Sequence, residues 1–203
     1  LALHGINNRE LLHHALKPNG CLAAARKLQA QQRVRFIGFS THATTDIILD
    51  AVSSAEFDFV NLHWYFVNDL NWPAILAARQ RDMGVFIISP NDKGGKLYTP
   101  PRKLVDRCAP LSPMQFNDLY CLARLEVHTL SHGPARPSDF DEHLGALEFC
   151  DRIAETIGPI EQRLRAEMDR VLGGDWCQRW FEGLPHYVDV PGQINISEIL
   201  RLW

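Results

Sequence analysis

Polar side chains that could take part in catalysis or binding follow two short apolar runs of the sequence. His4 comes directly after the apolar residues at the start of the chain, and Ser40 and Thr41 come directly after Phe39. A neutral imidazole can donate a hydrogen bond to a carbonyl oxygen, and hydroxyl groups both donate and accept. If these runs are parallel strands of a barrel, the polar residues stand at the mouth where barrels bind ligands.

Two further segments suit a phosphate group. Ser89 precedes the pair Gly94-Gly95, and glycine lacks the Cβ that would keep backbone N–H groups away from an anion. Arg136 and Ser138 lie at the expected start of a helix. There the guanidinium N–H groups of Arg136 would lie beside the positive end of the helix dipole. The structural alternatives are a plain surface turn at the glycines and a helix N-cap at Ser138.

Short apolar or β-branched runs alternate with helical patterns, which is typical of βα units with a parallel sheet. The runs are nearly continuous in apolar residues, as expected where both faces of a sheet are covered. Five units of roughly 30 residues fill about 150 residues, whereas an eight-unit barrel needs about 250. We therefore predict an incomplete (β/α)8 TIM barrel with about strands 4–8 present. The expected strands are Leu1–His4, Val34–Ser40, Phe57–Trp64, Gly84–Pro90 and Glu126–Leu130.

Helix signals follow each expected strand, and the character of the chain changes near its end. Apolar residues recur at helical spacing after Thr156, and Gly173-Gly174 stops this pattern. We expect a barrel part at 1–155 and a helical extension at 156–203. The other expected helices are Cys21–Gln31, one opened by Thr44 or Thr45, one capped by Asn71, one started by Ser112-Pro113 and one after Pro137-Ser138.

Composition excludes several classes of protein. Hydrophobic residues make up 46% and charged residues 22% of the 203 residues, which is typical of globular domains. The formal charge of −3 provides no basic field, so neither nucleic acid nor a membrane surface is an expected partner. The five cysteines form no CxxC pair and no run of about 18 apolar residues occurs, which favours a cytoplasmic protein without disulfides.

Several segments resemble aldo-keto reductase signatures in their expected order. The resemblance covers about residues 1–150, with one βα unit between successive matches. The matching segments are Leu3-His4, Arg33–Ser40, Phe57–Asn61, Ile88-Ser89-Pro90 with Gly94–Leu97, and Gly133–Ser138 with Glu142-His143.

This resemblance implies an NADP(H)-dependent oxidoreductase that transfers hydride to or from a small aldehyde or ketone. His4 would be the catalytic histidine that positions the carbonyl group. The residues at the family's cofactor positions are Ser40, Thr41 and Asn61 for nicotinamide, Ser89, Gly94, Gly95 and Leu97 for the pyrophosphate, and Arg136, Ser138, Glu142 and His143 for the 2′-phosphate and adenine. The family's acid is a Tyr tuned by a Lys and an Asp, and these lie on the first three βα units.

Three positions depart from the family pattern. Thr41 stands where Asn is usual and Asn61 where Gln is common, and both retain hydrogen-bonding capacity. Ile88 stands where a planar side chain often stacks on nicotinamide. The C-terminal segment is similar to that of a bacterial subgroup with a cysteine-rich iron-sulfur motif, but only Cys177 remains, so no metal or iron-sulfur cluster is expected.

Two other functions stay open on the sequence. The chain could be a non-catalytic remnant or interaction module that retains a cofactor half-site. It could also be another barrel enzyme that binds a sugar phosphate at the strand 7–8 loops. We also expect self-association through an open barrel edge, because unpaired strands and apolar surface would be exposed there.

Overall fold

The computed structural model describes residues 1–91, 93, 96–134 and 136–202. The chain divides into two compact units, which are described separately. The first comprises Leu1–Trp64, Asn68–Ile88 and Arg124–Ser131, and the second comprises Tyr65–Val67, Ser89–Ala123 and His132–Trp203. The expected boundary at residue 155 stays a prediction, although the long helix that spans it belongs to the second unit.

The first unit is built on a parallel sheet. Its described strands pair in chain order, β1-β2-β3-β4-β5, so each strand lies beside the next along the sequence. This confirms the parallel α/β arrangement that the alternating pattern predicts. The strands are β1 Ala2–Leu3, β2 Gly38–Ser40, β3 Phe59–Leu62, β4 Gly84–Ile88 and β5 Thr129–Ser131.

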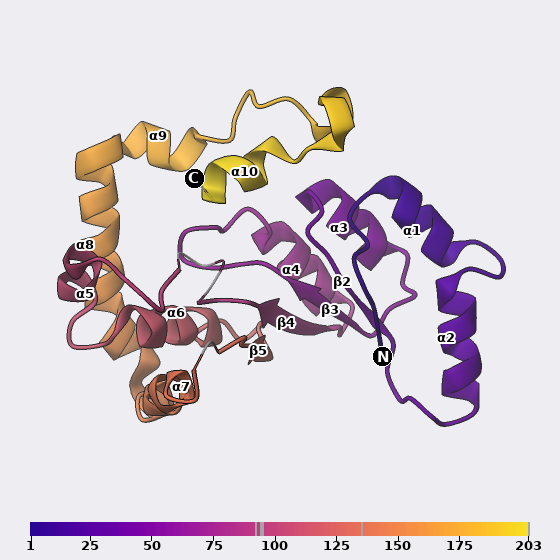
Figure 1. Ribbon diagram of the computed structural model, residues 1–203, viewed down its shortest axis with the longest axis horizontal. Coiled ribbons are helices and arrows are strands. Elements are labelled where there is room, and N and C mark those ends of the chain that lie inside the picture. The colour runs from indigo at the N-terminus through magenta and orange to yellow at the C-terminus, as the bar shows by residue number, and fades with distance from the viewer. Residues whose placement is uncertain (92, 94–95, 135, 203) are drawn as a thin grey trace. The chain divides into compact units, whose positions relative to one another are not determined.

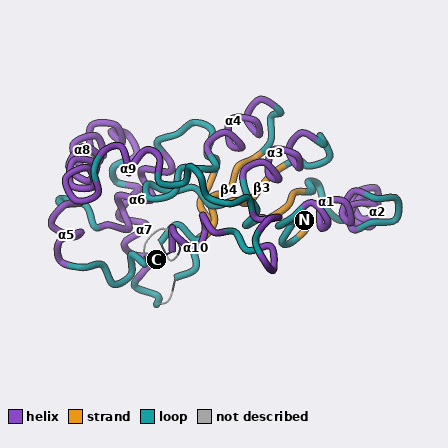
Figure 2. Tube along the Cα trace, turned by 90° about the horizontal axis from the view of Figure 1, so that it is seen from above, coloured by secondary structure: helices purple, strands orange, loops and turns teal. Residues whose placement is uncertain are grey.

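Helices cover one face of this sheet. Figures 1 and 2 show α3 and α4 along the strands β3 and β4. Apolar side chains on that face of β2, β3 and β4 have no exposed surface: Phe39, Val60, Leu62, Val85 and Ile87. The helices of the first unit are α1 Arg9–Leu16, α2 Cys21–Ala30, α3 Thr45–Ser53 and α4 Trp72–Gln80.

The opposite face of the sheet is only partly covered. Alternate residues of a strand point to opposite faces, and Phe59, Asn61 and Phe86 alternate with the buried set and are partly exposed. The expectation that both faces are covered is therefore wrong for this face among the described residues. This second face carries the polar residues at the strand ends.

The second unit is helical. Its α6, Pro113–Leu122, begins at the capping box that Ser112 forms with Gln115, in which the backbone N–H of Gln115 donates to Ser112 Oγ over 3.2 Å. The other helices are α5 Arg102–Cys108, α7 Asp139–Leu147, α8 Ile153–Leu172, α9 Gly174–Arg179 and α10 Ile196–Leu202, with short 3-10 turns at Cys150–Arg152, Tyr187–Asp189 and Pro191–Gln193.

The long helix α8 ends where the glycine pair predicts. Gly173 has a φ of 86°, in the left-handed region that glycine adopts without strain, and its N–H donates to the carbonyl of Asp169. Helix α8 packs against α5 and α6 of the same unit. Among the described residues, no helix combines the length and apolar character that a membrane crossing needs.

Candidate functional site

The polar residues at or near the carboxyl ends of β1, β2 and β3 form a row on the partly covered face. Leu3 pairs with Phe39, which places His4 beside Ser40, and Ser40 pairs with Asn61 on the next strand. Register partners in a parallel sheet point to the same face. His4 directly follows β1, Ser40 is the last residue of β2 and Asn61 is the last but one of β3. The sheet therefore brings all three side chains together near the carboxyl ends of its strands.

The hydroxyl of Ser40 fixes the orientation of the His4 ring. Ser40 Oγ lies 3.0 Å from Nδ1 of His4 and accepts a hydrogen bond from the backbone N–H of Gly5 at 3.1 Å. A hydroxyl group has one proton and two lone pairs, so Ser40 can donate to Nδ1 of His4 while it accepts from Gly5. In that arrangement Nε2 carries the ring proton, and His4 is an exposed residue.

Thr41 is engaged within the protein. Its hydroxyl donates to the carbonyl of Ile6 at 2.7 Å and accepts from the N–H of Ala43 at 2.9 Å, and the residue is 1% exposed. The donor of this hydroxyl is therefore already in use. A cofactor contact by Thr41 stays a prediction that requires this bond to be shared.

Asn61 carries a buried polar atom in need of a partner. Its Oδ1 is buried and accepts no hydrogen bond from any residue that the structure describes. A buried carbonyl oxygen without a donor costs free energy, so such an atom commonly marks a place where a ligand donates. An amide N–H2 group is a donor of the right kind for it.

The predicted phosphate residues lie in the second unit. Ser89 follows β4 with a φ of 52°, a left-handed conformation that is strained for a residue with a side chain. The N–H of Leu97 donates to the carbonyl of Asn91 at 2.7 Å, which closes a loop. Gly94 and Gly95 lie outside the described residues.

Arg136 has a partner that the sequence analysis missed. Its Nε and Nη2 donate to Oδ1 of Asp139 at 3.2 and 2.9 Å, and its backbone N–H donates to Oδ2 at 2.8 Å. Asp139 is 1% exposed, whereas the Arg136 side chain is 60% exposed. The guanidinium group is thus oriented by Asp139 and still accessible. Ser138 is the N-cap of α7 but makes no side-chain capping bond.

His143 belongs to a buried cluster with Asp118 and His132. The Nδ1 of His143 donates to Oδ2 of Asp118 at 2.7 Å, and the two imidazole rings are stacked with centroids 3.8 Å apart. The hydrogen bond that His143 donates to Asp118 raises the pKa of His143, against the opposing effect of burial. Burial lowers the pKa of His132, and the charge of Asp118 opposes this shift.

One nitrogen of His143 takes no part in the hydrogen bonds of this cluster. The Nε2 of His143 is buried and has no hydrogen-bond partner among the described residues, and the neighbouring Glu142 is partly exposed. No sequence motif marks Asp118, because it lies on α6, 25 residues before His143. The contact between Asp118 and His143 exists only in the folded chain.

A metal ion suits this cluster poorly. One possible ligand atom each from Asp118, His132 and His143 lies within 4.8 Å of the others. The ring planes, however, are inclined by only 24°. Imidazole binds a metal along the in-plane lone pair of its nitrogen, and the lone pairs of two stacked rings do not converge on one point. We therefore treat the cluster as a hydrogen-bonded group.

The comparisons with known proteins rest on structure rather than on sequence. No protein-family model matches the sequence, and no curated protein matches it. The fold is similar to that of the aldo-keto reductase AKR11C1 from Bacillus halodurans, in its holo form with a TM-score of 0.64 and 16% identity. The apo form of the same protein gives a TM-score of 0.61 and 15% identity.

These two matches cover 80% of this chain. The chain spans 57% of the holo-form chain and 60% of the apo-form chain, so it corresponds to little more than half of that protein. The parallel sheet, its order and the helices on one face agree with this similarity. Over the matched part of its length, the chain has the aldo-keto reductase fold.

Proposed function

We propose that this chain contributes the cofactor-binding part of an NADP(H)-dependent oxidoreductase that transfers hydride between nicotinamide and the carbonyl carbon of a small aldehyde or ketone. The observation that carries the proposal is the row of His4, Ser40 and Asn61 near the carboxyl ends of three neighbouring strands. Active sites of barrel enzymes lie at that end of the strands.

The row provides two complementary hydrogen-bonding groups. The Nε2–H of His4 can donate to a substrate carbonyl oxygen and hold it for reaction. The buried Oδ1 of Asn61 can accept from the carboxamide N–H2 of a nicotinamide ring and would gain the donor that it lacks. Bound NADP(H) would supply the hydride, while the protein orients and polarises the carbonyl.

Residues of the second unit suit the nucleotide end. Arg136 is held by Asp139 through two of its nitrogens, and its exposed remaining donors can bind a phosphate. The buried Nε2 of His143 can pair with an adenine edge. Ser89, Leu97, Ser138 and Glu142 are proposed to line the same nucleotide, as the family resemblance implies.

The test is a fluorescence titration of the 203-residue chain with NADPH and with NADH. We expect saturable NADPH binding that weakens about 10-fold or more in Arg136→Ala, because a charge-assisted hydrogen bond of about 1.5–3 kcal/mol is lost. NADH binding should change little in the same variant, since NADH has no 2′-phosphate. Arg102→Ala is the matched control, because the Arg102 side chain is 86% exposed on α5.

Other outcomes would replace the proposal. A chain that binds NADPH saturably would be a non-catalytic module if it reduced no carbonyl compound. This should hold even when the first three βα units of an aldo-keto reductase barrel are supplied with it. A sugar phosphate that raises the melting temperature where NADPH does not would favour the third barrel function. Asn61→Ala adds an independent readout, because it should weaken both NADPH and NADH if Asn61 contacts the carboxamide.

A further inference from the structure

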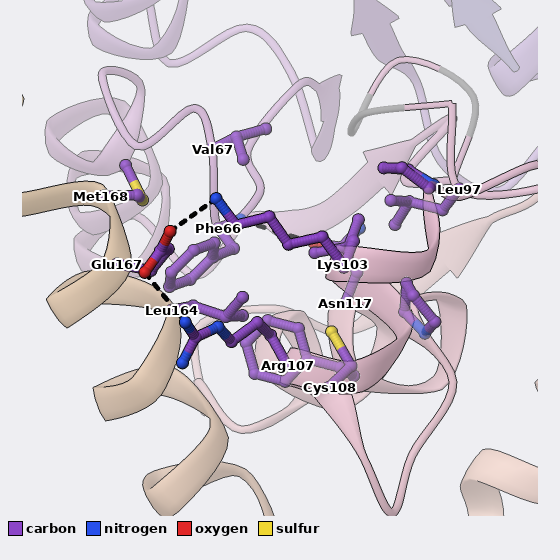
Figure 3. Close-up of a pocket in the computed structure, with 14 residues that line it drawn as sticks. Phe66, Val67, Leu97, Lys103, Arg107, Cys108, Asn117, Leu164, Glu167 and Met168 are labelled. Carbon is purple, nitrogen blue, oxygen red and sulfur yellow. Dashed lines mark hydrogen bonds and ion pairs between the residues drawn. The ribbon is translucent and has the colours of Figure 1, made fainter. Parts of the chain in front are cut away.

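A cavity of about 340 Å³ lies within the second unit, apart from the row of polar residues. It lies between α5, the start of α6 and α8, and Figure 3 shows the side chains that line it. This volume is at the lower end of the range for small-molecule sites. The lining residues are Phe66, Val67, Leu97, Pro101, Lys103, Leu104, Arg107, Cys108, Pro113, Phe116, Asn117, Leu164, Glu167 and Met168.

The wall of this cavity is apolar even where its residues carry polar atoms. The Nδ2 of Asn117 donates to the carbonyl of Pro90 at 2.8 Å, and its Oδ1 accepts from the N–H of Phe66 at 3.5 Å. Burial raises the pKa of Cys108 to about 11, so its thiol stays neutral and behaves as a small hydrophobic group. The wall therefore favours a hydrocarbon chain over a polar solute.

Charged groups stand together at one side of the cavity. Glu167 accepts from Lys103 Nζ at 2.5 Å and from Arg107 Nη2 at 3.0 Å, as the dashed lines in Figure 3 mark. Arg170 also binds Glu167, at 2.7 Å. The hydrogen bonds from Arg170 and Lys103 lower the pKa of Glu167 to about 2, so this carboxylate stays charged and neutralises one of the three cations.

The charge that remains there is positive. Lys103 and Arg107 line the cavity together with one acid, and their side chains are 62% and 42% exposed. Both have donors beyond those that bind Glu167, because an ammonium group has three and a guanidinium group five. An incoming anion can therefore share these donors with Glu167.

We propose that this cavity binds a small amphipathic anion, a medium-chain carboxylate, with its hydrocarbon chain among Phe66, Leu164 and Met168 and its carboxylate at Lys103 and Arg107. Leu97 is the one predicted cofactor residue among the described lining residues. The proposal does not rest on the proposed reductase function, because its test contains no nucleotide.

The experiment is a titration of the full chain with decanoate below its micelle concentration, followed by the methyl signals of labelled methionine. The three methionines are Met83, Met114 and Met168, and only Met168 lines the cavity. We expect a saturable shift of the Met168 signal and none of Met83, which lies in the first unit. An unchanged Met168 signal would overturn the proposal.

Two variants test the position of the chain. Val67→Trp should fill the cavity and weaken decanoate binding about 10-fold or more, because Val67 lines it and is 46% exposed, so the larger ring need not disturb the core. Val171→Trp is the matched control, on α8 but outside the lining and 56% exposed. Equal weakening in both variants would place the ligand elsewhere and overturn the proposal.

The charged group is tested with ligands of equal chain length. Decanoate should bind more tightly than decanol, and decyltrimethylammonium should bind most weakly. Lys103→Gln and Arg107→Gln should each weaken decanoate about 10-fold, the loss of a charge-assisted hydrogen bond, and leave decanol unchanged. Equal affinity for the three ligands would contradict the assignment of an anion.

Discussion

At the residue scale, the two stacked histidines beside the buried carboxylate of Asp118 have pKa values that are shifted in opposite directions. His143 donates directly to Asp118 at 2.7 Å, whereas the Nε2 of His132 lies 3.7 Å from the other oxygen. The bond to Asp118 favours the cationic form of His143, whereas burial favours the neutral form of His132, so the stacked rings avoid the repulsion of two positive charges. The contributions of the two histidines to stability therefore change in opposite directions with pH.

The sign of each contribution to stability follows from the direction of its pKa shift. The raised pKa of His143 provides stability that is complete below the usual histidine pKa and is lost as pH rises through the folded-state pKa. The lowered pKa of His132 provides stability above the usual histidine pKa that is lost as pH falls through its folded-state pKa. Stability from the cluster therefore declines on both sides of an intermediate pH.

We expect His143→Gln to lower the free energy of unfolding by about 1–3 kcal/mol at the acidic end of the pH interval in which the protein is folded, because the charge-assisted bond to Asp118 is lost. The loss should shrink as pH rises. Urea unfolding between about pH 5 and about pH 8 measures it, with His13→Gln on the exposed side of α1 as control. Parallel pH profiles for the wild type and His143→Gln would contradict this assignment.

Residue types and order predicted the row at the strand ends but not the partners of its neighbours. His4 and Ser40 follow apolar runs, so the sequence predicts them at strand ends, whereas Asn61 was singled out by the family resemblance, inside an expected strand, and joins them through the strand register. Asp139 lies three residues after Arg136, a spacing that allows an ion pair at the start of a helix and could have indicated this partner. Asp118 could not be found, since its contact with His143 depends on how α6 and α7 pack.

At the scale of elements, close approach of strands β2 and β3 depends on Gly38. A Cβ built at Gly38 would lie 2.4 Å from both the Cδ2 atom and the carbonyl oxygen of Phe59. The side chain could turn away, but the carbonyl belongs to the paired strand. The glycine is thus required by the neighbouring backbone rather than by its own φ angle.

Gly38→Ala should lower the free energy of unfolding by about 1–3 kcal/mol, because overpacking forces the strands apart. Gly133→Ala is the control, since no atom of the described residues lies within 4 Å of a Cβ at that position. Its effect should stay within about 0.5 kcal/mol. Thermal or urea unfolding measures both, and equal stability of the two variants would show that the sheet accommodates the methyl group.

Helix starts were predicted more accurately than strand lengths. Thr44, Asn71 and Ser112 occupy the expected N-cap positions. The strand expected over Val34–Ser40 pairs only at Gly38–Ser40, because an apolar run does not reveal where its partner ends. The helix α5 was not predicted, since it is stabilised by α8, whose Glu167 binds Arg107 across 60 residues.

At the scale of the whole molecule, the sequence predicted the parallel topology but not which segments make up the two compact units. Alternation of strands and helices is a local pattern, whereas the second unit collects Tyr65–Val67 with segments much later in the chain. A further cavity of about 580 Å³ in the first unit is lined by Leu1, Val34, Phe36, Phe59 and Phe86 among others. Phe36 is 57% exposed there.

We expect the isolated chain to self-associate through this apolar surface and the adjoining strand edge. Sedimentation velocity should show an average mass that rises with concentration, and Phe36→Asp should shift it toward the monomer. Leu125→Asp is the control, because Leu125 is 85% exposed in the same unit but outside the cavity lining. A monomer at every concentration, with sharp thermal unfolding, would contradict the expectation.

The consecutive order of the strands has a consequence for synthesis on the ribosome. Every strand after β1 pairs with the strand that precedes it in the chain, so its partner has already left the exit tunnel when it emerges. The sheet can therefore grow one strand at a time during translation. A nascent chain halted after β3 would already contain His4, Ser40 and Asn61 on adjacent strands, before any residue of α8 has been made.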